Sequence, residues 1–191
     1  MARILVIDES QKRAVDICSG LIQAGHQVAA VLPSAQELIE RIEEIKPDII
    51  LIETESPSRD TLEHLAVMNR DMPRPVVMFS QDGDSGTIRS AIQAGVAAYV
   101  VDGFDIGRLK PVVDVAVARF DEHQSMKREL ADAGRKLSER KIIDKAKGIL
   151  MKSRGLDEDT AYAALRKLAM EQSQPLAKVA ANLVDMARLL L

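Results

Sequence analysis

Hydrophobic and polar positions follow two different patterns along the first 118 residues. Short apolar runs are separated by longer segments in which apolar residues recur every three or four positions, the period of an amphipathic helix. The apolar runs lie at residues 3–7, 28–32, 49–52, 76–79 and 98–101. Unbroken apolar runs suit strands that are covered on both faces. The pattern therefore predicts an α/β domain over residues 1–118, with a doubly wound sheet of five parallel strands.

The pattern becomes purely helical from Val112 onward. Mostly apolar or small residues then recur in a seven-residue repeat with charged residues between them, although Arg119 and His123 are polar members of the seam. The repeat comprises Val112, Ala116, His123, Met126, Leu130, Ala133 and Leu137. We expect residues 112–138 to form a linker helix that pairs with a second copy as a coiled coil, which makes the chain a homodimer. The alternative is a helix that folds back onto its own α/β domain.

Residues 136–191 are predicted to form a small all-α domain of three helices. The first helix ends at Gly155, Asp157 is a good N-cap for the second, and Pro175 opens the third. On a helical wheel of the first helix, lysines and arginines flank an apolar face. We expect Met151 and Met170 to lie in the core of this domain, and Tyr162 in the core or at its edge, with a platform for base stacking as the alternative for Tyr162.

The charge balance divides the chain in the same place. The net charge is −3, but residues 1–118 carry 11 Lys and Arg against 18 Asp and Glu, whereas residues 119–191 carry 15 against 11. The first part is therefore acidic, at −7, and the second is basic, at +4. A basic domain behind an acidic one suggests different partners for each, with a polyanion for the second.

Composition and length restrict where the protein works. The 191 residues are 47% hydrophobic and 29% charged, typical of a globular protein. No apolar run approaches the roughly 18 residues needed to span a bilayer. The N-terminus lacks the features of a signal peptide, and Cys18 is the single cysteine. We therefore expect a cytoplasmic protein without a membrane partner.

Polar residues follow the predicted strands at their carboxyl ends, where ligand sites of parallel sheets lie. These residues are Asp8, Glu9, Glu53, Ser80 and Asp102. Clustered carboxylates can hold a hard divalent cation such as Mg²⁺. The sequence thus predicts an acidic site at one edge of the sheet, with Mg²⁺ at Asp8, Glu9 and Glu53 as a weak alternative to no cofactor.

This constellation resembles the receiver domain of response regulators, a flavodoxin-like fold. The resemblance places an acidic pair at Asp8 and Glu9 and the hydroxyl at Ser80. It also implies a phosphoryl-accepting Asp where this chain has Glu53, and a Lys where it has Asp102. Lys normally acts there as a point cation, and Asp102 reverses that charge. We interpret residues 1–118 as a degenerate receiver that docks a protein. A working phosphorylated receiver and a purely structural domain are the alternatives.

The basic domain resembles the ANTAR domain of transcription antitermination regulators. The resemblance lies in the stretch LSERKIIDKAKGILMKSRGLDEDTAYAALRKLAM, which begins at Leu137. It implies RNA binding: the family recognises paired stem-loops in a leader transcript and thereby prevents a terminator hairpin from forming. We expect the RNA contacts at Arg140, Lys141, Lys145, Lys147, Gly148 and Arg166.

With a degenerate receiver ahead of it, the whole chain is similar to the nitrate-assimilation antiterminators of the NasT type. That similarity implies control by a nitrate-sensing regulatory protein instead of by phosphorylation. The alternative is a DNA-binding or phosphorylation-dependent two-component response regulator. An enzyme is not expected, because residues 119–191 contain no nucleophile–base arrangement, metal cluster or phosphate loop.

Overall fold

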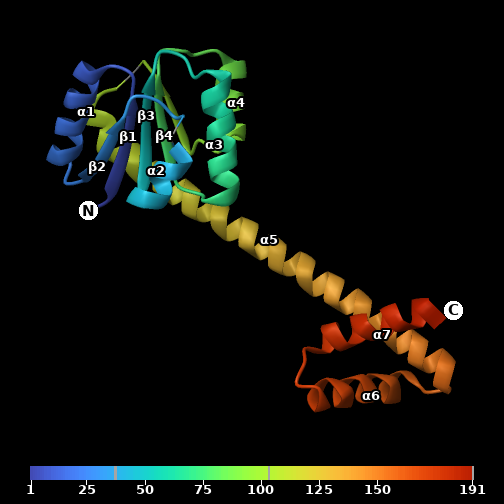
Figure 1. Ribbon diagram of the computed structural model, residues 1–191. Helices are drawn as coiled ribbons and strands as arrows, with labels where there is room; N and C mark the ends of the chain where they lie inside the picture. The colour runs from blue at the N-terminus through green and yellow to red at the C-terminus, as the bar shows by residue number, and fades with distance from the viewer. Residues whose placement is uncertain (37, 103, 191) are drawn as a thin grey trace. The chain divides into compact units, whose positions relative to one another are not determined.

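A computed structural model describes residues 1–36, 38–102 and 104–190. The chain divides into two compact units, Met1–Gln124 and Ser125–Leu191. Figure 1 shows the α/β architecture of the first unit and the helices of the second. Each unit is described below by itself. Within the described residues, no helix is both long enough and apolar enough to cross a membrane.

The first unit contains a five-stranded parallel sheet in the order β2-β1-β3-β4-β5. The strands are β1 (Arg3–Asp8), β2 (Gln27–Leu32), β3 (Ile49–Thr54), β4 (Val76–Ser80) and β5 (Ala98–Val101). The helices of this unit are α1 (Gln11–Gln23), α2 (Leu38–Ile45), α3 (Arg59–Asp71), α4 (Ser85–Gln93) and the start of α5 (Ile106–Arg154). The predicted doubly wound parallel fold is confirmed.

Each face of the sheet has its own core. On one face, side chains of β1, β3 and β4 pack against α2, α3 and α4 through residues such as Leu38, Leu65 and Ala91. On the other face, α1 and α5 pack against the sheet through residues such as Leu21 and Val113. Both faces are covered because consecutive apolar residues of a strand point to opposite sides.

The caps of α1 and α3 bring functional loops into position at the carboxyl end of the sheet. Ser10 accepts a hydrogen bond from the backbone N–H of Arg13, and Ser58 does the same for Thr61. Each hydroxyl satisfies one of the orphan donors at a helix start. Because α1 begins three residues after β1, its first turn lies directly over the acidic end of the sheet.

Helix α5 belongs to both units. Its first turns pack on the sheet, where Val113 and Ala116 are buried and Val112 is partly buried. Two of the predicted coiled-coil positions, Val112 and Ala116, therefore serve the core of their own domain. Beyond Gln124 the remaining apolar positions are uncovered in this single chain. Met126 is 56% exposed and Leu130 is 76% exposed.

The second unit is a bundle of the last part of α5 with α6 (Glu158–Glu171) and α7 (Leu176–Leu190). Helix α5 ends at Arg154 because Gly155 takes a positive φ of 62°, which stops helical hydrogen bonding. Asp157 caps α6, as expected, by accepting from the N–H of Thr160. The core consists mainly of Ala146, Leu150, Ala161, Leu165, Ala180 and Val184.

Three expectations about this core were wrong. Tyr162 is 43% exposed, Met151 is 38% exposed and Met170 is 72% exposed. The buried stripe of α6 runs through Ala161 and Leu165, every fourth residue, and Tyr162 and Met170 each lie one position past it. One position is a turn of 100° about the helix axis, which directs these side chains toward solvent.

Candidate nucleic-acid interface and the acidic end of the sheet

Two buried carboxylates lie on neighbouring strands at the carboxyl end of the sheet. Asp8 of β1 and Glu53 of β3 are register partners, and each is only 3% exposed. Asp8 accepts hydrogen bonds from the backbone N–H of Ser10 at 2.7 Å and from Nη2 of Arg13 at 3.1 Å. The first turn of α1 therefore supplies Asp8 with its own cation, and the bonds to Asp8 in turn raise the pKa of Arg13.

Glu53 is buried without equivalent support. Its Oε2 atom has no hydrogen-bond partner. Burial, and to a smaller extent the charge of Asp8, raises the pKa of Glu53 from 4.5 to about 7, although the charge of Arg13 acts in the opposite direction. Between pH 4.5 and about 7, where an ordinary glutamate is ionised, Glu53 therefore keeps its proton in the folded protein.

The other predicted members of the acidic site are placed differently. Ser80 is buried, and its hydroxyl donates to the carbonyl oxygen of Glu55 at 2.9 Å and accepts from the N–H of Asp82 at 3.1 Å. The hydroxyl of Ser80 thus connects the loop after β3 to the loop after β4. Glu9 and Asp102 are exposed, and Asp102 has a positive φ of 73°. The structure thus brings together Asp8, Glu53 and Ser80 but leaves the side chains of Glu9 and Asp102 at the surface.

Metal binding at this edge finds no geometric support. In the parts of the chain that the structure describes, no group of three or more His, Cys, Asp and Glu side chains is placed to hold a metal ion. The physical reason at this end of the sheet is the guanidinium of Arg13, which already occupies Asp8.

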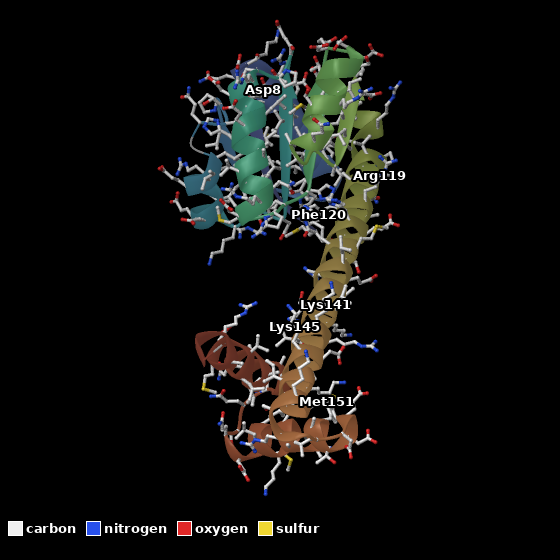
Figure 2. All side chains as sticks on the ribbon, turned by 90° about the vertical axis from the view of Figure 1, so that its right-hand side faces the viewer. Asp8, Arg119, Phe120, Lys141, Lys145 and Met151 are labelled. Carbon is white, nitrogen blue, oxygen red and sulfur yellow. The ribbon has the colours of Figure 1, made fainter. Side chains whose placement is uncertain are left out.

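The cations proposed for RNA binding lie on α5 and α6 of the second unit. Arg140, Lys141 and Lys145 are exposed on α5, and Arg166 is exposed on α6. Lys141, Lys145 and Met151 follow one another along α5 in Figure 2. Gly148 lies among these residues, and a Cβ atom added to it would meet nothing within 4 Å.

Lys147 differs from these cations because two carboxylates already hold its ammonium group. Its Nζ atom lies 2.8 Å from Oδ1 of Asp144 and 2.7 Å from Oε1 of Glu158, and its side chain is only 15% exposed. These bonds raise the pKa of Lys147 and lower that of Asp144. The side chain joins α5 to the first turn of α6, where Glu158 also suits the helix dipole. The ammonium group of Lys147 is therefore paired within the domain.

Two grooves run along opposite flanks of α5, and Gly148 lines both. The groove between α5 and α6 has a volume of about 370 Å³ and contains Arg140 and Lys147 together with Asp144 and Glu158. Its cations and carboxylates are equal in number. The environment there favours internal ion pairs over binding of a polyanion.

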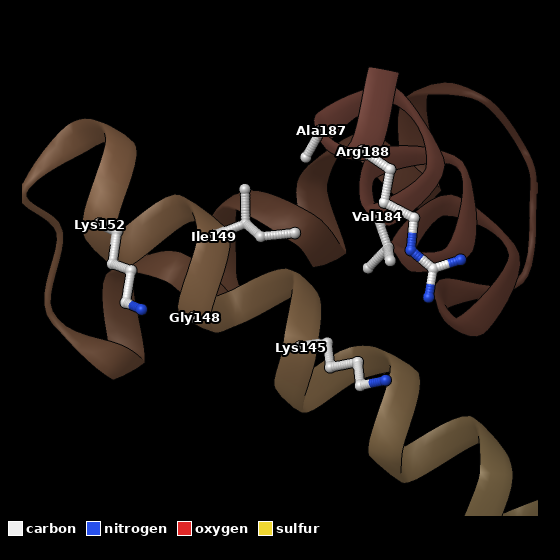
Figure 3. Close-up of a pocket in the computed structure, with 7 residues that line it drawn as sticks. All are labelled: Lys145, Gly148, Ile149, Lys152, Val184, Ala187 and Arg188. Atoms are coloured by element: carbon white, nitrogen blue, oxygen red, sulfur yellow. The ribbon is translucent and has the colours of Figure 1, made fainter. Parts of the chain in front are cut away.

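The groove between α5 and α7 is larger, and the charged residues among its described lining are all cations. Its volume is about 560 Å³, and its lining consists of Lys145, Gly148, Ile149, Lys152, Val184, Ala187 and Arg188. Figure 3 shows Lys145, Gly148, Ile149 and Lys152 on α5, with the three α7 residues across the groove. Sequence reasoning did not include Lys152 or Arg188 among the RNA contacts. Arg188 could have been found from its spacing, because it lies one helical turn after Val184, a buried residue of α7.

Comparison with known proteins identifies both units. The response regulator receiver domain matches residues 4–114, more than half of the chain, and the ANTAR domain matches residues 131–184. The chain is an ANTAR response regulator. Its predicted family is therefore confirmed. ANTAR response regulators are RNA-binding antiterminators, a regulatory family and not a family of enzymes.

Relatives of this ANTAR response regulator include the transcriptional regulatory protein PdtaR of Mycobacterium tuberculosis, which is 27% identical over 178 residues. That match covers 93% of this chain and 87% of PdtaR. The nitrate regulatory protein of Klebsiella oxytoca is 40% identical over 80 residues, covering 42% of this chain but only 20% of that protein. The signal receiver domain of a modulated diguanylate cyclase from Desulfovibrio desulfuricans G20 superimposes with a TM-score of 0.56 at 17% identity. It covers 64% of this chain and 98% of that domain, and shows the fold alone.

Proposed function

We propose that this ANTAR response regulator binds paired stem-loops in a leader transcript and prevents a terminator from forming, in control of nitrate or nitrite assimilation genes. The observation that carries the proposal is the cationic surface of a domain matched by the ANTAR family. The likeness to a nitrate regulatory protein supports the choice of genes. In this proposal residues 1–118 dock a protein, residues 112–138 form the linker and residues 136–191 bind RNA.

The proposed RNA contacts are the predicted residues that the structure leaves accessible to a polyanion. Among the residues expected from sequence, Arg140, Lys141, Lys145 and Arg166 are exposed, and Gly148 leaves room for an RNA group. Lys147 leaves the proposed set because Asp144 and Glu158 hold its ammonium group. Phosphate contacts by such cations release counterions, so RNA affinity is expected to fall steeply as salt rises.

Regulation through a docked protein, with nitrate as its signal, is proposed in preference to phosphorylation. Three features of the acidic end support this choice. Glu53 stands at the acceptor position, Arg13 pairs with Asp8, and Asp102 stands where the family has Lys. A phosphoryl group on Glu53 would enter a site without the Lys that normally neutralises it, beside a carboxylate already bound to a guanidinium.

Pairing of two copies is proposed through α5. The uncovered apolar side chains Met126, Leu130 and Leu137 recur at coiled-coil spacing, with 56%, 76% and 56% exposure. Leucines left exposed at such positions bury their surface when a second helix packs against them. A parallel pair would also provide two RNA-binding domains for two stem-loops.

The test of function is to identify the RNA and to measure the preference for it. Transcripts cross-linked to the full-length protein in cells are sequenced, and the leader recovered is then compared with duplex DNA in a salt titration. We expect leaders of nitrate or nitrite assimilation genes that carry two hairpins, bound more tightly than duplex DNA at every salt concentration. A preference for duplex DNA would instead support the DNA-binding alternative.

A further inference from the structure

We propose that the α5–α7 groove is a pocket for an unpaired base of the RNA loop, with Lys152 and Arg188 holding the phosphates on either side of that base. The inference rests on the proposed RNA-binding function and specifies how a loop is read. The groove combines an apolar floor with a cationic rim, which is the combination that a nucleotide requires. Its volume of about 560 Å³ lies in the range of small-ligand sites, about 300–1,000 Å³.

The floor of the groove suits a flat, apolar ring. Ile149, Val184 and Ala187 form it, and Ile149 and Val184 also belong to the core cluster of the domain. Gly148 lies beside them and leaves the space above the backbone open, because a Cβ atom at this position would meet nothing within 4 Å. Unpaired loop bases are the parts of an RNA hairpin that can be splayed out and stacked on a protein.

The rim of the groove carries cations and no carboxylate among its described lining residues. Lys145 and Lys152 come from α5, and Arg188 comes from α7. The side chain of Arg188 is 70% exposed, and its ion pair with Asp185 spans 3.8 Å between two exposed side chains. Such a pair is weak and easily exchanged for a phosphate. The guanidinium is also planar and can stack on a base.

The α5–α6 groove provides an internal comparison for this assignment. Gly148 lines that groove too, but its cations face Asp144 and Glu158. A phosphate entering there would be repelled by two carboxylates and would have to break the ion pairs of Lys147. The charge distribution therefore directs the RNA loop to the α7 side of α5.

The test measures how the full-length protein binds one fixed RNA. A pool of two-hairpin RNAs with randomised loops is selected on the wild type, and one selected RNA is then used throughout. Gly148→Leu fills the groove, and we expect it to weaken binding about tenfold, since stacking of a base contributes roughly 1–3 kcal/mol. The matched control is Gly134→Leu on the same helix, where an added Cβ also meets nothing; we expect its RNA affinity to stay within about twofold of the wild type.

Base occupancy is tested by removing bases from the selected loops one position at a time. We expect one abasic position to weaken the wild type about tenfold but to cause no further loss in Gly148→Leu, because the same stacked base is absent in both cases. Arg188→Gln should reduce the salt slope of binding by about 0.7, the value for one phosphate on a single strand. Lys178→Gln, an exposed cation on the same helix, is its control and should leave the slope unchanged.

The outcomes separate this inference from the proposed function. If the selection yields no RNA that binds the wild type, the proposed function fails and the groove assignment fails with it. If the wild type binds RNA and Gly148→Leu and Arg188→Gln bind equally well, only the groove assignment is overturned. If Gly148→Leu changes the oligomeric state in sedimentation while RNA affinity is retained, the groove is an interface between protein chains, which also overturns the inference.

Discussion

Replacing Glu53 with Gln should stabilise the receiver unit at alkaline pH and have a much smaller effect at acid pH. The side chain is 3% exposed, its Oε2 atom lacks a partner, and burial raises its pKa from 4.5 to about 7. An acid with a raised folded-state pKa binds its proton more tightly when folded than when unfolded. The contribution of Glu53 to stability is therefore fully present below pH 4.5 and is lost as the pH rises through about 7. Glutamine remains neutral throughout and does not incur this loss.

The size of the effect follows from the change in pKa. A difference of about 2.5 pH units corresponds to about 3 kcal/mol once Glu53 is ionised in both states. At pH 5 Glu53 keeps its proton in the folded protein, and the free energy of unfolding has fallen by less than about 1 kcal/mol from its value at low pH. We therefore expect the advantage of Glu53→Gln over the wild type to grow by about 2–3 kcal/mol between pH 5 and pH 8. Other titrating groups are common to both proteins and cancel in the comparison.

The assay is urea unfolding followed by the fluorescence of a single tyrosine. The chain has two tyrosines and no tryptophan. In a Tyr162→Phe background, Tyr99 reports on the receiver unit alone, where its hydroxyl donates to the carbonyl oxygen of Asp82 at 2.8 Å. Glu55→Gln is the control, because Glu55 is an exposed acid on the loop after the same strand. A stability gain for Glu53→Gln of equal size at pH 5 and pH 8 would refute the reasoning.

Three further predictions concern the dimer, the bundle and phosphorylation. Leu130→Asp should abolish or strongly weaken dimer formation in analytical ultracentrifugation while the unfolding midpoint of the receiver stays unchanged, because Leu130 is 76% exposed in the single chain; a dimer that survives would exclude pairing at this position. Lys147→Gln should lower the unfolding midpoint of the ANTAR domain slightly through loss of its two ion pairs; a large loss of RNA affinity without a loss of stability would return Lys147 to the RNA contacts. Glu53→Asp should show no acetyl phosphate-dependent change in RNA affinity, and a clear change would show that the phosphorylation switch persists.

The fold could be predicted from the sequence because its signals are local. Apolar runs marked the strands, and the rule that parallel strands end at one edge placed Asp8 and Glu53 together, as the register confirms. The partner of Asp8 could not be predicted in the same way. Arg13 reaches it only because Ser10 caps α1 at a particular residue, which orients the first turn of the helix over the strand end. A helix beginning one residue later would direct Arg13 elsewhere.

The core of the ANTAR domain shows a second limit of prediction from the sequence. Tyr162 was expected in the core or at its edge, but the buried face of α6 runs through Ala161, Leu165 and Ala169. Tyr162 lies one position past Ala161, a rotation of about 100° about the helix axis, and is 43% exposed. Helical spacing alone did not decide which of the adjacent residues Ala161 and Tyr162 faces the core.

Lys145 and Lys147 show why a basic stretch alone does not define an RNA surface. Two positions on a helix differ by about 200°, so these lysines lie on opposite flanks of α5. The α6 flank places Asp144 and Glu158 around Lys147, whereas the α7 flank places Lys145 beside Lys152 and Arg188, with no carboxylate among the lining residues that the structure describes. The positive charge that remains available to a polyanion is therefore concentrated on the α7 flank. Which cations are neutralised within the domain depends on where α6 and α7 pack, and only the structure determines that.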